Sequence, residues 1–205
     1  MIVVVDYGMG NVGSIANMLK KVGAEALISS SAQDIERAAK LILPGVGAFD
    51  AAMERINASG LRAALDRRAL EDKVPVLGIC LGMQLLTRSS EEGELAGLGW
   101  IAARTVAFRG RIDRQLKSPH MGWNLVQLHT PSPLTAGFAT LTEPRFYFVH
   151  SYFVECAEPA AAIMRTTYGV TYDSAIHEGN IYGVQFHPEK SHRFGMALLG
   201  NFARL

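Results

Sequence analysis

The first ninety residues alternate between two hydrophobic periods. A β-branched run at residues 2–5 is followed by a glycine-rich turn and then by apolar side chains at helical spacing, from Val12 through Ile15 and Leu19 to Val22. The same alternation recurs along the chain, which predicts strands at residues 26–28, 41–43 and 74–79 and helices at 32–39, 51–70 (broken) and 81–87. Short, continuously apolar strands are typical of a parallel sheet that helices cover on both faces. We therefore expect an α/β fold in this half.

From Trp100 onward the pattern changes to closely spaced strand-like segments with turns between them. They lie at residues 104–108, 123–128, 145–149, 152–156, 161–167, 170–177 and 181–186, and a last helix is expected at 194–204. Such spacing predicts an antiparallel extension that continues or caps the first sheet. No repeat or linker-like stretch interrupts the chain, so we expect residues 1–205 to form one domain: an open, mostly parallel sheet with helices on both faces and an antiparallel extension in the C-terminal half.

Composition narrows the class of protein. Of the 205 residues, 49% are hydrophobic and only 19% are charged, which is typical of a globular protein with a core. The 20 basic and 19 acidic residues leave a net charge of +1, so a nucleic-acid partner is not expected. The nearest basic footprint is better interpreted as a solvated face; it consists of Arg104, Arg109, Arg111, Arg114 and Lys117.

The cysteines and the apolar runs indicate where in the cell the protein is expected. Cys80 and Cys156 are far apart and lack a CxxC motif, so neither a disulfide framework nor a cysteine-built zinc site is indicated. The longest uncharged apolar stretch, residues 74–86, is too short to span a bilayer, and residues 1–5 are too short for a signal sequence. We expect a cytoplasmic protein that does not enter the membrane.

Two glycine-rich loops are candidate ligand sites. Residues 8–13 match the G-x-G-x-x-G dinucleotide fingerprint, but the second strand ends in serines where that fingerprint needs an acidic residue for the ribose. A tight strand-to-helix turn is therefore the favoured interpretation. Residues 44–47, Pro-Gly-Val-Gly, follow a strand at the carboxyl edge of the expected sheet, where a glycine can turn its backbone N–H toward a ligand.

The segment Gly78-Ile79-Cys80-Leu81-Gly82 has the form of a nucleophile elbow, a sharp turn between a strand and a helix whose neighbours must be small. A strand is predicted before it and a helix after it, as the motif requires. The helix dipole at such a turn favours a thiolate. Cys80 is therefore the candidate nucleophile, whereas Cys156 is interpreted as a small buried hydrophobe.

A nucleophilic thiol needs a base, and the base needs an acceptor that orients it. His187-Pro188-Glu189 follows the strand at 181–186, so His187 also falls at a sheet edge, and in extended backbone Glu189 points to the same side. Cys80, His187 and Glu189 thus form a candidate triad. His129, His177 and His192 have no ligand-like spacing, so no metal site is expected.

These motifs resemble a known family. Residues 78–84 together with Gln185-Phe186-His187-Pro188-Glu189 are similar to the class I (triad) glutamine amidotransferases, whose glutaminase domain hydrolyses glutamine and passes ammonia to a synthase. Within them, residues 119–124, 148–152 and 189–191 resemble the HisH-type glutaminase subunits of imidazole glycerol phosphate synthase, an enzyme of histidine biosynthesis. The resemblance extends from Asp6 to the C-terminal helix.

The resemblance implies roles for further residues. Gln84, Ser151 and Tyr152 would bind glutamine, with Glu92 near its amino group, and the N–H groups of Leu81 and Gly47 would form the oxyanion hole. No cofactor or metal would be required. The partner would be a cyclase subunit of the HisF type, bound as a heterodimer through four residues: Asn11, Met121, Trp123 and Lys190. From residue type alone, a core position is the default interpretation of Trp123, and only the resemblance places it at the docking face.

One departure and three rival hypotheses stay open at this point. After Lys190-Ser191 the chain reads His192-Arg193-Phe194-Gly195, which is more similar to paralogues in surface-polysaccharide gene sets that would feed a sugar amidotransferase. A dinucleotide-dependent oxidoreductase would rest on residues 8–13 alone. A non-catalytic binding module is disfavoured by the intact triad. A cysteine peptidase would share the chemistry but not the substrate.

Overall fold

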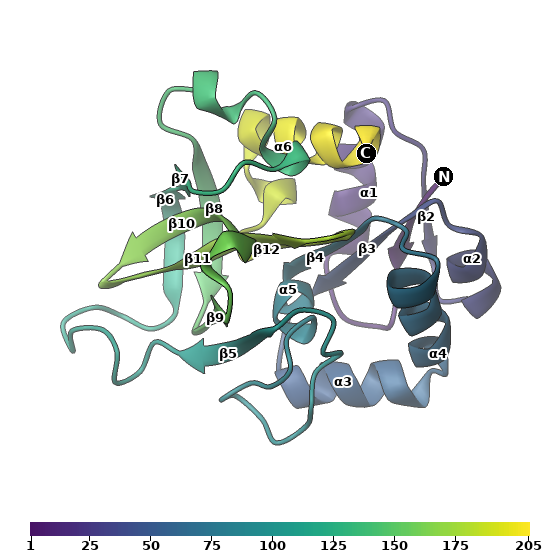
Figure 1. Cartoon of the computed structure of the whole chain (residues 1–205), viewed down its shortest axis with the longest axis horizontal. Coiled ribbons are helices and arrows are strands. Elements are labelled where there is room, and N and C mark those ends of the chain that lie inside the picture. The colour runs from purple at the N-terminus through teal and green to yellow at the C-terminus, as the bar shows by residue number, and fades with distance from the viewer.

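The computed structural model describes residues 1–205 and is built around a ten-stranded sheet (Figure 1). Five strands of this sheet run parallel in the order β2-β1-β3-β4-β12. Their bounds are β1 Ile2–Val5, β2 Ala26–Ser29, β3 Lys40–Gly45, β4 Val76–Cys80 and β12 Ile181–Val184. Because they are parallel, the segments that follow β1, β3, β4 and β12 emerge at one edge, and the candidate catalytic residues lie there.

Antiparallel strands extend the sheet beyond β12. They are β11 (Val170–Glu178), β10 (Ala162–Tyr168), β7 (Gln127–Leu128), β9 (Tyr152–Cys156) and β5 (Ala103–Ala107). A separate antiparallel ribbon pairs β6 (His120–Leu125) with β8 (Arg145–His150), from His120 opposite His150 to Leu125 opposite Arg145. The predicted fold class is confirmed.

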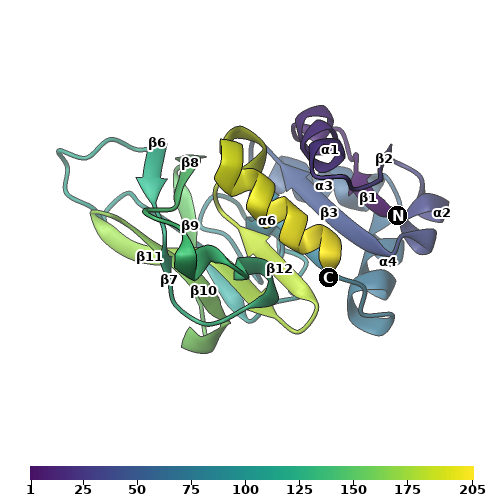
Figure 2. The ribbon, with the colours of Figure 1, turned by 90° about the horizontal axis from the view of Figure 1, so that it is seen from above.

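Helices cover both faces of the sheet. In Figure 1, α1 (Val12–Lys21) and α6 (His192–Arg204) lie above the sheet, and α3 (Phe49–Ala58) lies below it. Figure 2 shows α6 lying across the molecule, with the β6–β8 ribbon at the end far from the N-terminus. Two buried clusters match these faces: one contains Ile15, Leu19 and Leu198, and the other contains Ile35, Phe49 and Ile56.

The remaining helical elements are short. They are α2 Ala32–Arg37, α4 Leu61–Asp66, α5 Leu81–Leu85, a π-helical turn Arg67–Glu71 and four 3₁₀ turns at Pro133–Thr135, Phe138–Thr140, Pro159–Ala161 and Pro188–Lys190. No helix of the structure has the length and apolar character that a membrane crossing needs.

Several sequence-predicted boundaries were wrong. The strand predicted at residues 123–128 begins at His120, because residue-by-residue pairing with β8 extends through Gly122, a residue with low strand propensity. The broken helix predicted from 51 to 70 begins at Phe49 and is interrupted at Gly60, whose φ is +74°. Helix α6 begins two residues earlier than expected, at His192, and α5 ends two residues earlier, at Leu85.

Candidate active site

The turn at Cys80 is strained and tightly packed. Cys80 has φ 56° and ψ −111°, a left-handed conformation that side chains rarely adopt, and it is 6% exposed. A Cβ on Gly78 would lie 2.7 Å from the Gly82 carbonyl oxygen, and one on Gly82 would lie 1.8 Å from the Leu43 oxygen. The two flanking glycines are therefore needed to bring β4, α5 and β3 this close together, as a nucleophile elbow requires.

His187 and Glu189 lie together behind the nucleophile. Glu189 Oε1 accepts a hydrogen bond from His187 Nδ1 at 2.8 Å, and the two side chains are 2% and 1% exposed. His187 Nε2 is buried and has no hydrogen-bond partner. Burial alone would lower the pKa of His187, but the neighbouring Cys80 and Glu189 outweigh it and raise that pKa to about 9.

A hollow of about 260 Å³ opens in front of Cys80. It brings together most of the residues implied by the resemblance, with three more that were not foreseen: its lining is Gly47, Cys80, Leu81, Gln84, Glu92, Pro119, Val149, His150, Ser151 and Tyr152. Leu81 is the first residue of α5, so its N–H has no acceptor within the helix. Gly47 has φ +108°, a conformation that favours glycine.

Glu92 is held at the wall of this hollow by α3. Its Oε2 accepts a hydrogen bond of 3.1 Å from the N–H of Phe49, the first residue of that helix. Burial raises the pKa of Glu92, and Asp50 raises it further, while the Phe49 N–H opposes both. A carboxylate at this position can accept from the ammonium group of an amino acid.

Three features of the site were missed by sequence reasoning. The Tyr7 hydroxyl donates to the Pro44 carbonyl at 2.6 Å and so fixes the 44–47 loop; burial raises its pKa, and Cys80 adds to this. Gln185 is fully buried and donates from Nε2 to Cys80 Sγ at 3.8 Å. Both contacts join residues far apart in sequence. Gln185 belongs to the motif that carries the resemblance, but the motif did not indicate its contact with Cys80.

The third is a cluster of buried imidazoles and a phenol behind the hollow. The Tyr172 hydroxyl lies 3.1 Å from both His120 Nδ1 and His150 Nε2, and His150 Nδ1 donates to the Tyr152 carbonyl at 2.8 Å. Burial lowers the pKa of His120 to about 4 and that of His150 to about 3, so both imidazoles are neutral near pH 7. No group of three or more His, Cys, Asp or Glu residues has a geometry that could hold a metal ion.

Three of the four residues expected at a partner interface, Met121, Trp123 and Lys190, lie on or beside the β6–β8 ribbon. Met121 is 62% exposed and Trp123 47% exposed, so the alternative interpretation of Trp123 as a core residue is wrong. The Trp123 ring stacks on His192, with ring centroids 5.4 Å apart and an interplanar angle of 4°. Lys190 is exposed and its Nζ lies 5.6 Å from the Tyr147 ring centroid; Asn11 is half-buried at the start of α1.

The loop at residues 8–13 is built as a turn. In a dinucleotide fold the third glycine permits close packing between helix and strand, yet a Cβ on Gly13 would have no neighbour within 4 Å. The Gly8 carbonyl accepts from Arg55 Nη1 at 2.9 Å. At the end of β2, the Ser29 hydroxyl donates to Asp34 at 2.6 Å and supplies no carboxylate for a ribose. These contacts favour the turn over a cofactor site.

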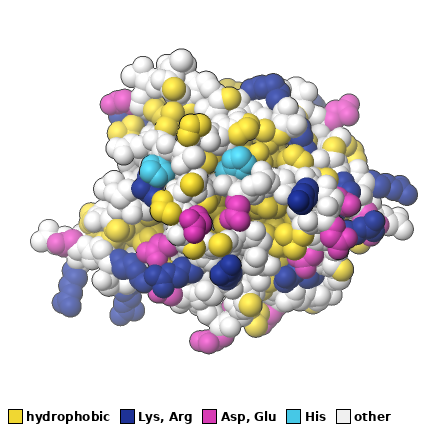
Figure 3. Space-filling model, viewed as in Figure 1, with side chains coloured by type: hydrophobic (Ala, Val, Ile, Leu, Met, Phe, Trp, Pro, Cys, Tyr) yellow, Lys and Arg dark blue, Asp and Glu magenta, His cyan; other side chains and the backbone are white.

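Carboxylates pair with some of the basic residues in and after β5. Lys and Arg side chains gather at the lower left of Figure 3, with Asp and Glu side chains beside them. Arg104 pairs with Glu155 at 2.9 Å, and Arg111 pairs with Glu91 at 2.8 Å. A solvated face remains the better interpretation of these charges.

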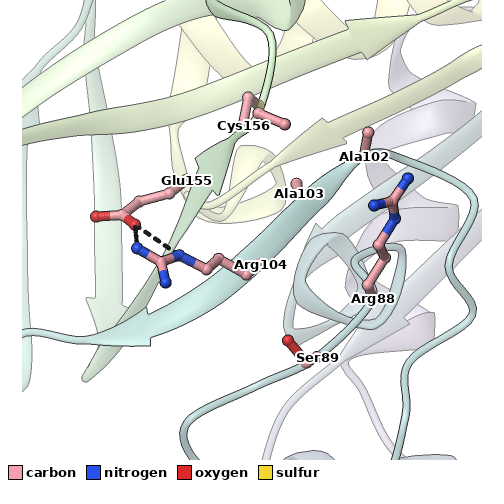
Figure 4. A pocket seen from close by; sticks show the side chains of 8 residues that line it. Arg88, Ser89, Ala102, Ala103, Arg104, Glu155 and Cys156 are labelled. Carbon is pink, nitrogen blue, oxygen red and sulfur yellow. Dashed lines mark hydrogen bonds and ion pairs between the residues drawn. The ribbon is translucent and has the colours of Figure 1, made fainter.

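A second hollow of about 400 Å³ lies beside β5 and β9 (Figure 4). Arg104 turns toward Glu155 there, while Arg88 stands apart from both. Cys156 lines this hollow, and burial, with a further contribution from Asp173, raises the pKa of its thiol. A thiol held in its neutral form is a poor nucleophile.

Comparison with known proteins relates the whole chain to one family. The family model described as glutamine amidotransferase class-I matches residues 3–204. The chain is 50% identical over 204 residues to "Imidazole glycerol phosphate synthase subunit HisH 2" of Methanococcus maripaludis, covering 100% of this chain and 99% of that protein. It is 48% identical over 206 residues to the subunit HisH of Bdellovibrio bacteriovorus, covering 100% of both.

Solved structures support the fold. The structure of PurLQS from Thermotoga maritima has a TM-score of 0.71 at 18% identity, covering 99% of this chain and 94% of that one. A crystal structure of a glutamine amidotransferase has a TM-score of 0.72 at 19% identity, covering 98% and 100%.

Proposed function

Because the chain belongs to the class I glutamine amidotransferases, and among them to the HisH subunits of imidazole glycerol phosphate synthase, we propose that Cys80 hydrolyses L-glutamine and that the ammonia passes to a synthase subunit. The whole of residues 1–205 would act as one glutaminase domain. The strongest support is the strained Cys80 turn facing a hollow of amino-acid size, with the orphaned Nε2 of buried His187 behind it.

Substrate binding follows from the polarity of the hollow. Gln84 donates from Nε2 to the Tyr152 carbonyl at 3.0 Å and to Gln185 Oε1 at 3.1 Å, which leaves its own Oε1 free as an acceptor for the substrate. Glu92 would take the α-ammonium group. The backbone of Ser151 and Tyr152 would bind the rest of the amino-acid end of glutamine, directing its carboxamide toward Cys80.

The first chemical step forms a thioester. Cys80 and His187 act as a pair in which His187 Nε2 holds the proton of the thiol, and the sulfur attacks the carboxamide carbon of glutamine. The N–H groups of Leu81 and Gly47 would hold the oxyanion, and removing such a donor typically costs about 3 kcal/mol. The imidazolium then gives its proton to the leaving nitrogen, the C–N bond breaks and ammonia departs.

The second step regenerates the enzyme. His187 takes a proton from water, the resulting hydroxide attacks the thioester carbon, and the C–S bond breaks to release glutamate. The proton returns to Cys80. Glu189 keeps the proton of neutral His187 on Nδ1, so that Nε2 is free to act as the base.

Replacing the nucleophile tests the chemistry. Cys80→Ser should lower glutamine turnover by at least about 10³-fold while the fold is kept, because it exchanges one atom for a far weaker nucleophile. Cys156→Ser is the matched control and should keep wild-type turnover. Full activity in purified Cys80→Ser, with host glutaminase excluded, would refute the assignment.

The partner is a HisF-type cyclase subunit in this proposal, bound as a heterodimer through the exposed side of the β6–β8 ribbon. Asn11, Met121, Trp123 and Lys190 would contact it. Capture of the cyclase subunit by this chain, followed by glutaminase assays with and without it, tests the pairing. Absence of binding at micromolar concentration would argue against this partner.

A second candidate acceptor enzyme is a sugar amidotransferase of surface-polysaccharide synthesis. The observation that favours it is His192, whose ring covers one side of Trp123 and so changes the surface offered to a partner. The glutaminase chemistry would be the same. Parallel capture assays with the two kinds of synthase distinguish the candidates, and stronger binding of the cyclase would exclude the second.

A further inference from the structure

A side-chain amide lies against the nucleophile. Gln185 follows β12 directly and is 0% exposed, and its Nε2 is 3.8 Å from Cys80 Sγ. Its neighbour His187 belongs to the candidate triad, but Gln185 itself has no role in the chemistry described above. We propose that Gln185 is a further catalytic residue, whose amide N–H stabilises the Cys80 thiolate; this rests on the proposed function.

The orientation of the Gln185 amide is fixed by a backbone carbonyl, a group that can only accept hydrogen bonds. The Tyr152 carbonyl accepts from Gln84 Nε2 at 3.0 Å, so the NH₂ end of Gln84 must face it. The second hydrogen of that NH₂ goes to Gln185 Oε1 at 3.1 Å. With its oxygen so engaged, Gln185 turns its own NH₂ toward Cys80. One backbone carbonyl thus determines the direction of both amides.

The surroundings of the sulfur explain why a donor is needed. The neutral thiol can donate to the Val149 carbonyl oxygen, 3.9 Å away. When the proton moves to His187 Nε2, the sulfur becomes negative and the same carbonyl lone pairs repel it. The Gln185 N–H then supplies the attraction that the Val149 carbonyl no longer gives, from a side chain that is itself fully buried.

The test measures the sulfur without glutamine. Gln185→Met keeps the length of the side chain but removes the donor, and its rate of Cys80 alkylation by iodoacetamide is compared with that of the wild type from pH 6 to pH 10. We expect alkylation to be about tenfold slower at pH 7, the loss typical of one hydrogen bond to a charged group. The deficit should shrink as pH rises, because alkali forms the thiolate without help.

The pH profile separates a catalytic role from a structural one. A pocket that is merely disordered would give the same ratio of rates at every pH, and that result, or rates within twofold of wild type, would overturn the proposal. Gln127→Met, at an exposed position in β7, is the matched control and should alkylate at the wild-type rate.

A second variant tests the proposal if Gln185→Met does not fold. If thermal melts show that Gln185→Met is unfolded, Gln185→Glu is measured instead, because it keeps the shape of glutamine and places an acceptor beside the sulfur. It should also alkylate about tenfold more slowly at pH 7, and a wild-type rate would overturn the proposal. Alkylation needs no glutamine. A wild-type protein without glutaminase activity would therefore refute the proposed function, while the alkylation rates would still test the role of Gln185.

Discussion

The proton of Cys80 has one base beside it, and the charge on that base controls the chemistry. Burial lowers the pKa of His187, but Cys80 and Glu189 outweigh this effect and raise that pKa to about 9. Above that pH the imidazolium loses its proton and cannot protonate the leaving nitrogen. Activity on glutamine is therefore expected to fall as pH rises through about 9.

Glu189→Gln tests this coupling. The substitution removes the negative charge that favours the imidazolium, so the pKa of His187 should fall and the alkaline limb of kcat/KM should move to lower pH. Turnover at pH 7 should drop by roughly 10²- to 10⁴-fold, yet less completely than in Cys80→Ser. Glu158→Gln, at an exposed position, serves as control. Wild-type turnover or an unmoved alkaline limb in Glu189→Gln would show that another group orients the histidine.

For single residues of the site, what could be predicted from the sequence depended on how far apart along the chain the contacting residues lie. His187 and Glu189 are two residues apart, and Gly78 and Gly82 are each two residues from Cys80. Local motifs were therefore sufficient to indicate Cys80, His187 and Glu189. Gln185 is 105 residues from Cys80, and Tyr7 is 37 residues from Pro44. Only the folded sheet edge brings such pairs together.

Among the secondary-structure elements, the elbow depends on the close approach of β3, β4 and α5. The parallel strands and the helices between them were predictable, because the strands are continuous apolar runs and the helices are amphipathic. The start of β6 was not predictable, because Gly122 has a low strand propensity and the strand there depends on pairing with β8. The π-helical turn Arg67–Glu71 likewise left no periodic signal that distinguished it from a helix.

Gly82→Ala and Gly13→Ala separate a glycine required by packing from one that is not. The Gly82 Cβ would meet the Leu43 oxygen at 1.8 Å, so we expect a loss of about 3 kcal/mol in the free energy of unfolding. Gly13 lies in the first turn of α1 with open space around it, and its replacement should stabilise the protein by about 0.5 kcal/mol. Urea unfolding measures both. A loss below 1 kcal/mol in Gly82→Ala would mean that the elbow can relax.

For the molecule as a whole, the β6–β8 ribbon has one buried and one exposed side. The buried side carries His120, Phe146, Phe148 and His150, while Met121, Trp123 and Leu125 are exposed. The ribbon stands at the same edge of the sheet as the nucleophile, because His187 pairs with Tyr147 of β8 through a backbone hydrogen bond of 2.9 Å. A partner bound on the exposed side would therefore lie close to the triad.

Trp123→Ala tests this surface. At 47% exposure Trp123 contributes little core packing, so its loss should lower the stability of the isolated chain by only about 1 kcal/mol, the typical value of its stacking on His192. Affinity for the synthase subunit should fall by at least about fivefold, because exposed tryptophans at interfaces are frequent hot spots.

The other tryptophan of the chain provides the contrast. Trp100 is 7% exposed and donates from Nε1 to Asp66 at 2.7 Å, so Trp100→Ala should cost about 3 to 5 kcal/mol of stability. Calorimetric melts of both isolated variants and titration of Trp123→Ala with the synthase subunit give the answer. A melting temperature of Trp123→Ala as low as that of Trp100→Ala, or an unchanged dissociation constant, would mean that the exposed side of the ribbon is not where the partner binds.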